Sequence, residues 1–299
     1  MELRLSQFDR YLQTVKNVSD TSRNAYENDV EDFSRYLDER SIRSICDVLP
    51  KHVSSYLAKL KEAGKSASTV NRRLASIRAY FSFLSSEGAV RGNPAVSVRA
   101  PRIEKRTVEY LTIAEVDELL SKPDDTVLGL RDRALLELLY GAGLRASEAA
   151  AANVEDVNLR VGFIACGSSA GKARIVPLGR PAKAALETYL FDSRPSLMAV
   201  KDDHVTGDRA LFVNYTGERL TRQGIWKILK EYGKGTAFEE KLTPQILRNS
   251  FAVHMIQNGA DLKSIQELLG SEDLASIKSY LSVAKTHIKD VYDRTHPRA

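Results

Sequence analysis

Apolar residues recur at helical spacing in four stretches of the first ninety residues. In each stretch an apolar side chain returns every three or four positions, which places these side chains on one face of a helix. The four stripes begin at Leu5, Tyr26, Val53 and Val70, and Gly88 ends the last one. Four such faces can be buried against one another, so this part of the chain predicts a small all-helical domain.

A short segment at residues 91–108 interrupts the helical pattern. It contains Gly92-Asn-Pro94 and Pro101, and proline disfavours a continuing helix. It is also rich in basic residues, which are Arg91, Arg99, Arg102, Lys105 and Arg106. The sequence therefore predicts a helical domain over residues 1–90 and a basic linker over 91–108. Such a linker can follow a phosphate backbone or serve as a flexible tether.

The remaining residues, 109–299, predict a second domain that is mostly helical with a small antiparallel sheet. Residues 130–140 are strongly apolar and predict a buried helix. Residues 162–166 and 174–178 predict two short strands paired around a loop, and residues 211–213 a further short strand. From residue 243 onward, helical patterns alternate with short turns. The fold class expected for the whole chain is therefore mainly α.

Composition limits the number of domains, the kinds of partner and the cellular compartment that this chain can have. Its 299 residues suffice for two domains with cores of their own. The net charge of +5 mildly favours a polyanionic partner, although a solvated basic surface would give the same value. Cys46 and Cys166 form no metal-ligand motif, and two thiols suit a reducing compartment. With no apolar run of membrane-spanning length and no signal peptide, we expect a cytoplasmic protein without a metal or cofactor.

Two arginines and one tyrosine stand in separate motifs of the second domain. Arg145 lies in Gly-Ala-Gly-Leu-Arg-Ala-Ser-Glu, Arg248 in Thr-Pro-Gln-Ile-Leu-Arg-Asn-Ser-Phe-Ala, and Tyr280 ten residues after Leu-Leu-Gly. Two guanidinium groups can bind the non-bridging oxygens of one phosphate, because each is a planar donor with a permanent charge. A tyrosine beside them can attack the phosphorus and form a covalent phosphotyrosine. The combination predicts DNA strand cutting and rejoining.

These motifs, in this order and spacing, resemble the tyrosine recombinases of the phage integrase family, and within it the Xer type. The resemblance covers nearly the whole chain. It implies an N-terminal four-helix core-binding domain of the SAM-like kind, followed by a catalytic domain over residues 109–299. It also implies that Arg145 and Arg248 bind the scissile phosphate and that Tyr280 is the nucleophile. The last residues would form a tail that docks into a neighbouring protomer.

Three positions depart from the family pattern. Gln245 stands where the family has the histidine of its His-x-x-Arg box, and Ser271 where it has His or Trp. Ser169 stands where the catalytic lysine is expected, while Lys172 is three places later. Lysine is long and flexible, so Lys172 is the candidate proton donor, with an ordinary surface lysine as the alternative. Gln245, Ser271 and Ser169 are candidate phosphate-binding residues because each can donate a hydrogen bond.

Two further groups of residues invite a functional interpretation. Arg72, Arg73 and Arg78 lie off the apolar face of the fourth helix, where they are candidate DNA contacts or a solvated outer face. His254 follows Arg248 by six residues, an offset that places it on another side of the helix. We therefore expect His254 to be a packing residue rather than a substitute for the missing acid–base group.

The sequence leads to a site-specific recombinase that forms a 3′-phosphotyrosine link with its DNA. Its expected partners are double-stranded DNA with a specific site and a second protomer or paralogue, in a tetramer on that DNA. The bond energy stays in the covalent link, so no metal or nucleotide is expected. The alternative is a DNA-binding accessory paralogue with weak or lost cleavage, because three catalytic positions differ.

Overall fold

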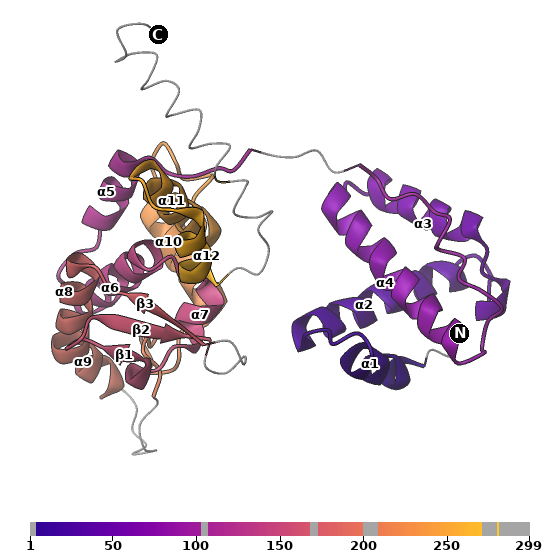
Figure 1. The fold of residues 1–299 in the computed structure, drawn as a ribbon, viewed down its shortest axis with the longest axis horizontal. Helices are drawn as coiled ribbons and strands as arrows, with labels where there is room; N and C mark the ends of the chain where they lie inside the picture. Colours follow the sequence, from indigo (N-terminus) through magenta and orange to yellow (C-terminus); the bar gives the residue numbers. More distant parts are fainter. Residues whose placement is uncertain (1–3, 103–106, 168–172, 200–208, 271–279, 281–299) are drawn as a thin grey trace, which may run out of the picture. The chain divides into compact units, whose positions relative to one another are not determined.

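The computed structural model describes residues 4–102, 107–167, 173–199, 209–270 and 280, apart from the side chain of Thr21. It divides into two compact units, Met1–Lys105 and Arg106–Ala299. The first unit is helical, and the second combines helices with a small sheet (Figure 1). The mainly α fold expected from the sequence is confirmed.

Four helices form the first unit. They are α1 (Leu5–Thr14), α2 (Asp20–Asp38), α3 (Pro50–Glu62) and α4 (Ala67–Ser86), and α4 contacts the other three. Pro50 occupies the first turn of α3, where its missing N–H is not needed, and the Ser66 side chain caps α4. Aromatic rings fill the space between helices: Phe8 of α1 meets the edge of Tyr80 of α4 at a centroid distance of 5.1 Å.

The chain after α4 packs back onto the first unit. Ala95 and Val98 are buried in its core. Arg78 on α4 donates to their carbonyl oxygens, from Nε to Ala95 at 3.1 Å and from Nη2 to Val98 at 2.6 Å. Asn93 in turn donates to the carbonyl of Arg78. Part of the segment expected to be a linker thus has fixed contacts, whereas residues 103–106 lie outside the described residues.

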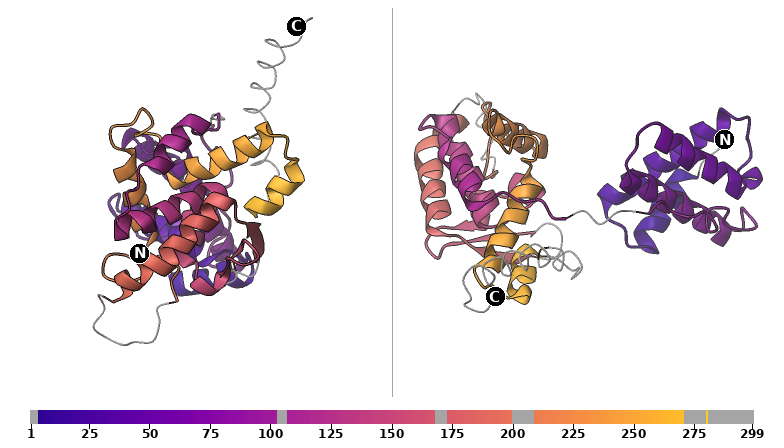
Figure 2. Two further views of the ribbon diagram at one scale, coloured as in Figure 1. Left: turned by 90° about the vertical axis from the view of Figure 1, so that its left-hand side faces the viewer. Right: turned by 90° about the horizontal axis from the view of Figure 1, so that it is seen from above.

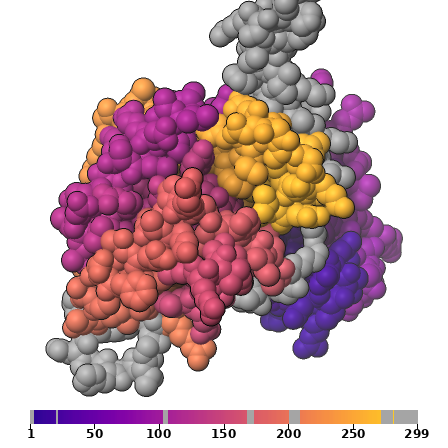
Figure 3. Space-filling model, turned by 60° about the vertical axis from the view of Figure 1, so that its left-hand side comes forward, coloured from indigo at the N-terminus to yellow at the C-terminus, as the bar shows by residue number. Residues whose placement is uncertain are grey.

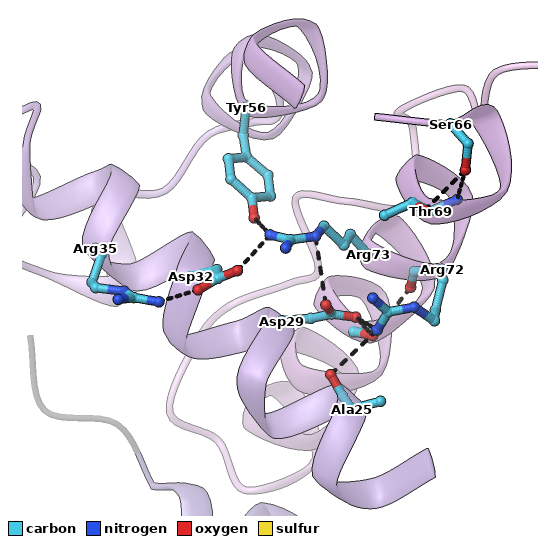
Figure 4. Close-up of polar contacts among 10 residues, drawn as sticks. Ala25, Asp29, Asp32, Arg35, Tyr56, Ser66, Thr69, Arg72 and Arg73 are labelled. Carbon is cyan, nitrogen blue, oxygen red and sulfur yellow. Dashed lines mark hydrogen bonds and ion pairs between the residues drawn. The ribbon is translucent and has the colours of Figure 1, made fainter. Parts of the chain in front are cut away.

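The buried carboxylate of Asp29 connects α2 with α4 (Figure 4). Asp29 of α2 is only 2% exposed, and it accepts a hydrogen bond of 2.8 Å from the hydroxyl of Ser76. Arg72 forms an ion pair with the same carboxylate, and Arg73 Nε lies 3.6 Å from its second oxygen. Ser76 is therefore a buried partner of Asp29.

Arg73 is held more firmly than Arg72. Its Nη1 atom lies 2.7 Å from Asp32 and donates to the hydroxyl of Tyr56 on α3 (Figure 4). The side chain of Arg73 is 15% exposed, whereas that of Arg72 is 43% exposed. Arg73 therefore joins three helices of the first unit, while the Arg72 side chain stays partly open to solvent.

The second unit is built around α6 (Val127–Gly141). Its apolar residues Leu135, Leu136, Leu138 and Leu139 are fully buried. It contacts α5 (Ile113–Ser121), α7 (Ala146–Ala151), α8 (Arg180–Thr188) and α11 (Pro244–Gln257). The apolar helix expected over residues 130–140 is thus confirmed. The unit also contains α9 (Arg194–Met198), α10 (Arg222–Gly233) and α12 (Leu262–Leu269).

Three short strands form one antiparallel sheet in the order β1 (Val157–Asn158), β2 (Phe163–Cys166), β3 (Arg174–Pro177). Within the β2–β3 pair, Ile164 lies opposite Val176 and Cys166 opposite Arg174. This register places Ile164, Val176 and Cys166 in the core, because alternate residues of a strand share a face. The paired strands expected around the loop at 167–173 are confirmed.

Two details differ from the expected secondary structure. Residues 211–213 do not extend the sheet; in the described part of the chain, isolated bridges link Ala210 with Asn153 and Val213 with Arg219. The helix α8 continues as a π-helical stretch, Tyr189–Ser193, before α9 begins. The hydroxyl of Tyr189 bonds to the Leu211 carbonyl, so the apolar run at 211–213 is buried against this stretch.

Helix α12 lies beside the sheet. A short turn joins α11 to α12, and the two appear as successive orange-yellow helices in Figure 2. Helix α12 contacts β3, and in the space-filling view its yellow surface adjoins the pink surface of the sheet region (Figure 3). This contact brings the end of α12 close to Arg174, the first residue of β3.

Candidate active site

The carboxylate of Glu148 lies between three arginines from different elements. Arg174 of β3 binds it with two parallel hydrogen bonds, Nη1 to Oε1 at 2.6 Å and Nη2 to Oε2 at 2.9 Å. Arg145 donates to it from its backbone N–H at 2.7 Å and from Nη1 at 3.0 Å. Arg248 Nη1 lies 3.8 Å from Oε2. One carboxylate thus gathers residues separated by about one hundred positions of sequence.

Local sequence explains how Arg145 and Glu148 meet. Arg145 precedes the first residue of α7, and Glu148 is the third residue of that helix. A glutamate at this position can return to the backbone N–H of the residue before the helix, as in a capping box. Gly143 makes the preceding turn with φ of +57°, and a Cβ there would lie 2.6 Å from the ring of Phe251. Only glycine fits this turn without strain.

Arg248 is anchored by backbone carbonyl groups. It is 4% exposed, and its two terminal nitrogens donate to the carbonyls of Gly143 and Leu269. Arg174 Nε donates to the adjacent carbonyl of Leu268 at 2.6 Å. The carbonyls of Leu268 and Leu269 belong to the last turn of α12, where a helix has unpaired acceptors and partial negative charge. Gly270, with φ of +58°, ends the helix and leaves room for the Arg174 side chain.

The charges of the cluster shift two pKa values strongly. Burial raises the pKa of Glu148, but the hydrogen bonds from Arg174 and Arg145 and their positive charges outweigh burial and bring it to about 2. Burial, followed by repulsion from Arg145, lowers the pKa of Arg248 to about 10. At pH 7 Glu148 is therefore ionised and Arg248 is protonated. Three guanidinium groups share one carboxylate, so the site carries excess positive charge.

A surface pocket of about 290 Å³ opens beside this cluster. Its lining includes the side chains of Arg145 and Arg248, together with Gln245 and Arg222. The remaining lining residues are Ala146, Ser147, Thr243 and Pro244. Arginine binds phosphate oxygens through charge-assisted hydrogen bonds. A positively charged pocket with several donors and this size can bind a phosphate group.

Tyr280 contacts Asn249, the residue that follows Arg248 in α11. It is 7% exposed, and its hydroxyl donates to Asn249 Oδ1 at 3.1 Å. Asn249 Oδ1 also accepts a hydrogen bond of 2.8 Å from Gln245 Nε2. Burial raises the pKa of Tyr280, while the charges of Arg248 and Arg145 act to lower it. The phenol is therefore protonated at pH 7 and lies within the field of both pocket arginines.

The structure brings together four of the residues selected from the sequence: Arg145, Arg248, Gln245 and Tyr280. Lys172, Ser169 and Ser271 lie outside the described residues. The three arginines of α4 belong to the other unit, where each is bonded to neighbouring residues.

His254 is a packing residue, as expected. It is 5% exposed, its Nδ1 atom lies 3.0 Å from the Tyr140 hydroxyl, and its ring meets the edges of Tyr110 and Tyr140. Burial lowers the pKa of His254, so the imidazole is neutral at pH 7. It points into a cluster of apolar and aromatic side chains rather than into the arginine pocket.

Three residues of the site escaped the sequence analysis. Glu148 and Arg174 were seen only as parts of a motif and a strand, and Arg222 was not considered. The spacing Arg-x-x-Glu at the start of a helix is a detectable signal for Glu148. No local signal exists for Arg174, because its partner is 26 residues away and the contact depends on the fold. Arg222 begins α10 beyond its Thr221 cap, and it reaches the pocket only through tertiary packing.

In the described part of the chain, no helix is long and apolar enough to cross a membrane. The same residues contain no group of three or more His, Cys, Asp or Glu side chains arranged to hold a metal ion. Cys166 is buried, and burial raises the pKa of its thiol to about 11.

Comparison with known proteins agrees with the geometry. Residues 109–287 match the phage integrase family and residues 5–88 its N-terminal SAM-like domain. The chain is 37% identical to the tyrosine recombinase XerD of Oceanobacillus iheyensis over 300 residues, with 100% of both chains covered. It is 41% identical to a putative tyrosine recombinase of Caldanaerobacter subterraneus, covering 99% of this chain and 98% of the relative.

Among solved structures, the Tn1549 transposon integrase in complex with transposon right end DNA has a TM-score of 0.71. It covers 97% of this chain and 99% of its own at 17% identity, which shows a shared fold. The chain belongs to the phage integrase family. Within that family it is a Xer-type tyrosine recombinase, an enzyme of site-specific DNA recombination.

Replacing Glu148 with glutamine tests the central carboxylate. A folded-state pKa of about 2 against the ordinary 4.5 means that Glu148 stabilises the fold fully above about pH 4.5. This stabilisation is lost as the pH falls through 2. We expect Glu148→Gln to lower the free energy of unfolding by roughly 3 kcal/mol at pH 7. Below pH 4.5, the free energies of unfolding of the variant and of the unchanged protein should become more similar.

Urea unfolding at a series of pH values, followed by the fluorescence of the single tryptophan, Trp226, measures this difference. Glu155→Gln is the matched control, because the Glu155–Arg209 ion pair is exposed and worth at most about 1 kcal/mol. The role given to Glu148 would be contradicted if the two substitutions lowered the free energy of unfolding equally at pH 7. It would also be contradicted if the loss caused by Glu148→Gln did not change with pH.

Proposed function

We propose that the pocket binds the scissile phosphate of duplex DNA and that Tyr280 attacks its phosphorus. The observation that carries this proposal is the meeting of two distant arginines at one pocket, with the tyrosine hydroxyl bonded to the residue next to Arg248. The phenolic oxygen would form a bond to phosphorus while the bond to the 5′ oxygen breaks. The products are a 3′-phosphotyrosine and a free 5′ hydroxyl, and the reverse reaction rejoins a strand.

The two arginines differ in their freedom to bind phosphate. Arg248 is buried and anchored by two carbonyl groups, so its remaining N–H groups present a fixed charge. The Arg145 side chain is 43% exposed and can adjust to an incoming group. Fixed donors directed at the developing charge stabilise a phosphoryl transfer state without reorganisation. Gln245 and Arg222 line the same pocket and supply further hydrogen-bond donors.

The leaving 5′ oxygen needs a proton, for which Lys172 is the proposed donor. A general acid of this kind contributes about 10²- to 10⁴-fold to a rate. Ser169 and Ser271 are proposed phosphate contacts, because a hydroxyl donates a hydrogen bond but is a poor acid. Gln245 has the same limitation, since an amide cannot shuttle a proton.

The proposed substrate is double-stranded DNA that carries a specific site, bound by a second protomer or a paralogue to complete a tetramer. The complex of the Tn1549 integrase with DNA supports a DNA partner, and strand exchange requires two duplexes. The proposed setting is the cytoplasm, where chromosome partition is one task for a Xer-type enzyme. The C-terminal tail would contact the neighbouring protomer.

In the first unit, the proposed DNA contact of α4 rests on Arg72. Arg73 and Arg78 are mostly bonded within the unit, and contribute by holding α4 in place. Arg72 shares Asp29 with Arg73, but its side chain is 43% exposed and can reach a phosphate.

A nicked suicide duplex tests cleavage by the whole protein. The duplex carries the recognition site, selected beforehand from a random duplex library by binding. We expect a covalent protein–DNA band on a denaturing gel, lost in Tyr280→Phe and kept in the control Tyr215→Phe, whose side chain is exposed. Lys172→Ala should slow trapping about 10²-fold or more, and a 5′-bridging phosphorothiolate, whose thiolate leaves without protonation, should restore it.

Duplex binding without any covalent band in the unchanged protein would contradict the proposed chemistry and favour an accessory DNA-binding protein. A band that persists in Tyr280→Phe would assign the attack to another residue. Unchanged trapping in Lys172→Ala would remove that lysine as the proton donor. Lys183→Ala, at an exposed i,i+4 ion pair, is the control for loss of a surface lysine.

The two neighbouring arginines of α4 provide a second test. Arg72→Ala should reduce the salt dependence of duplex binding by about one phosphate contact. It should lower the free energy of unfolding by less than Arg73→Ala does, because Ser76 still donates to the buried Asp29 carboxylate and no contact to Asp32 or Tyr56 is lost. Arg73→Ala should lower the free energy of unfolding by about 2 kcal/mol or more, because it leaves the buried Asp29 and the Tyr56 hydroxyl short of a partner. Salt titrations of duplex binding and urea unfolding measure both quantities. An unchanged salt slope in Arg72→Ala would exclude the proposed contact.

A further inference from the structure

Asn249 makes three hydrogen bonds at the edge of the pocket. Its Nδ2 group donates to the Glu109 carbonyl at 2.9 Å. Its Oδ1 atom accepts from Gln245 Nε2 at 2.8 Å and from the Tyr280 hydroxyl at 3.1 Å. The mechanism described above uses Tyr280 and Gln245 but assigns no task to the amide that joins them.

The Glu109 carbonyl fixes the orientation of this amide. A backbone carbonyl accepts hydrogen bonds and cannot donate, so the nitrogen of Asn249 faces Glu109 and the oxygen faces Tyr280. The donor from Gln245 favours the same orientation. Two independent contacts therefore fix the Asn249 amide so that its oxygen faces the Tyr280 hydroxyl.

An oriented acceptor determines where the phenolic hydrogen points. With its hydrogen directed at Asn249, the Tyr280 oxygen has its lone pairs free to face other directions. An amide oxygen accepts a hydrogen bond but does not take up a proton at neutral pH. Asn249 can thus orient the hydroxyl, while the phenolic proton leaves to solvent when the oxygen attacks.

We propose that Asn249 is a positioning residue for the nucleophile, holding the Tyr280 hydroxyl so that an oxygen lone pair is presented to the bound phosphate. This inference rests on the proposed role of Tyr280. Gln245 contributes to it twice, as a lining residue of the pocket and as the second donor to Asn249. The glutamine found in place of the family's histidine thereby supports the nucleophile through hydrogen bonding.

Two substitutions separate this role from a structural one. Asn249→Ala and Asn249→Asp both remove the bond to the Glu109 carbonyl, but only aspartate keeps an acceptor for Tyr280. The substrate is the suicide duplex with a 5′-bridging phosphorothiolate at the scissile position, so that protonation of the leaving group does not limit the rate. The full-length protein is used at saturating concentration, and the rate of covalent trapping is measured in a single turnover.

We expect trapping by Asn249→Ala to be about tenfold slower, the value of one net hydrogen bond, with duplex binding unchanged. Asn249→Asp should stay within about threefold of the unchanged protein. Asn249→Leu, which has a similar shape and no acceptor, should behave like Asn249→Ala and serves if the alanine variant does not fold.

Three results would overturn the inference: unchanged trapping in Asn249→Ala, faster trapping in it, or equal slowing by alanine and aspartate. Faster trapping would mean that Asn249 holds the phenol away from the phosphate. Absence of trapping in the unchanged protein would instead refute the proposed function itself, so the two failures are distinguishable.

Discussion

The carboxylate of Glu148 is the group on which the arrangement of the site depends. Arg145, Arg174 and Arg248 approach it from the start of α7, from β3 and from α11. Three guanidinium groups so close would repel one another without an anion between them. One carboxylate neutralises only part of this charge, and the phosphate proposed to bind in the adjacent pocket would neutralise a further part. The contacts of Glu148 with the three arginines thus stabilise the fold and leave a positive charge that favours an anionic ligand.

The last turn of α12 binds all three arginines of this charged cluster. Carbonyl groups of Leu268 and Leu269 accept hydrogen bonds from Arg174, Arg248 and Arg145. The chain between this turn and Tyr280 begins at Gly270, so the position of α12 constrains where the tyrosine can reach. Tyr280 then meets α11 through Asn249. Helix α11 therefore connects the arginine cluster, through Arg248, with Tyr280, through Asn249.

Local patterns predicted much of the fold but only part of the site. Apolar periodicity is a local property, so a stripe such as the one beginning at Val70 was enough to predict a helix. The two paired strands at residues 162–166 and 174–178 were likewise predicted from local sequence. Contacts between distant residues left no such signal: Arg174 meets Glu148, and Asn249 meets Tyr280, only after folding. Residues 95–98 were assigned to a linker because Gly92, Pro94 and Pro101 interrupt the helical pattern around them, whereas Ala95 and Val98 complete a core. The structure brings Arg145, Arg248, Gln245 and Tyr280 together, but their roles, like those of Lys172, Ser169 and Ser271, stay predictions.

The central claim is that Arg145, Arg248 and Tyr280 act on one phosphate. A crystal structure of the Tyr280→Phe protein bound to its recombination site tests it most directly. We predict one backbone phosphate with both guanidinium groups at hydrogen-bonding distances of about 2.7–2.9 Å and the ring of residue 280 beside the same phosphorus. A phosphate bound by only one of the two arginines, or a ring of residue 280 that lies at a different phosphate, would contradict the account.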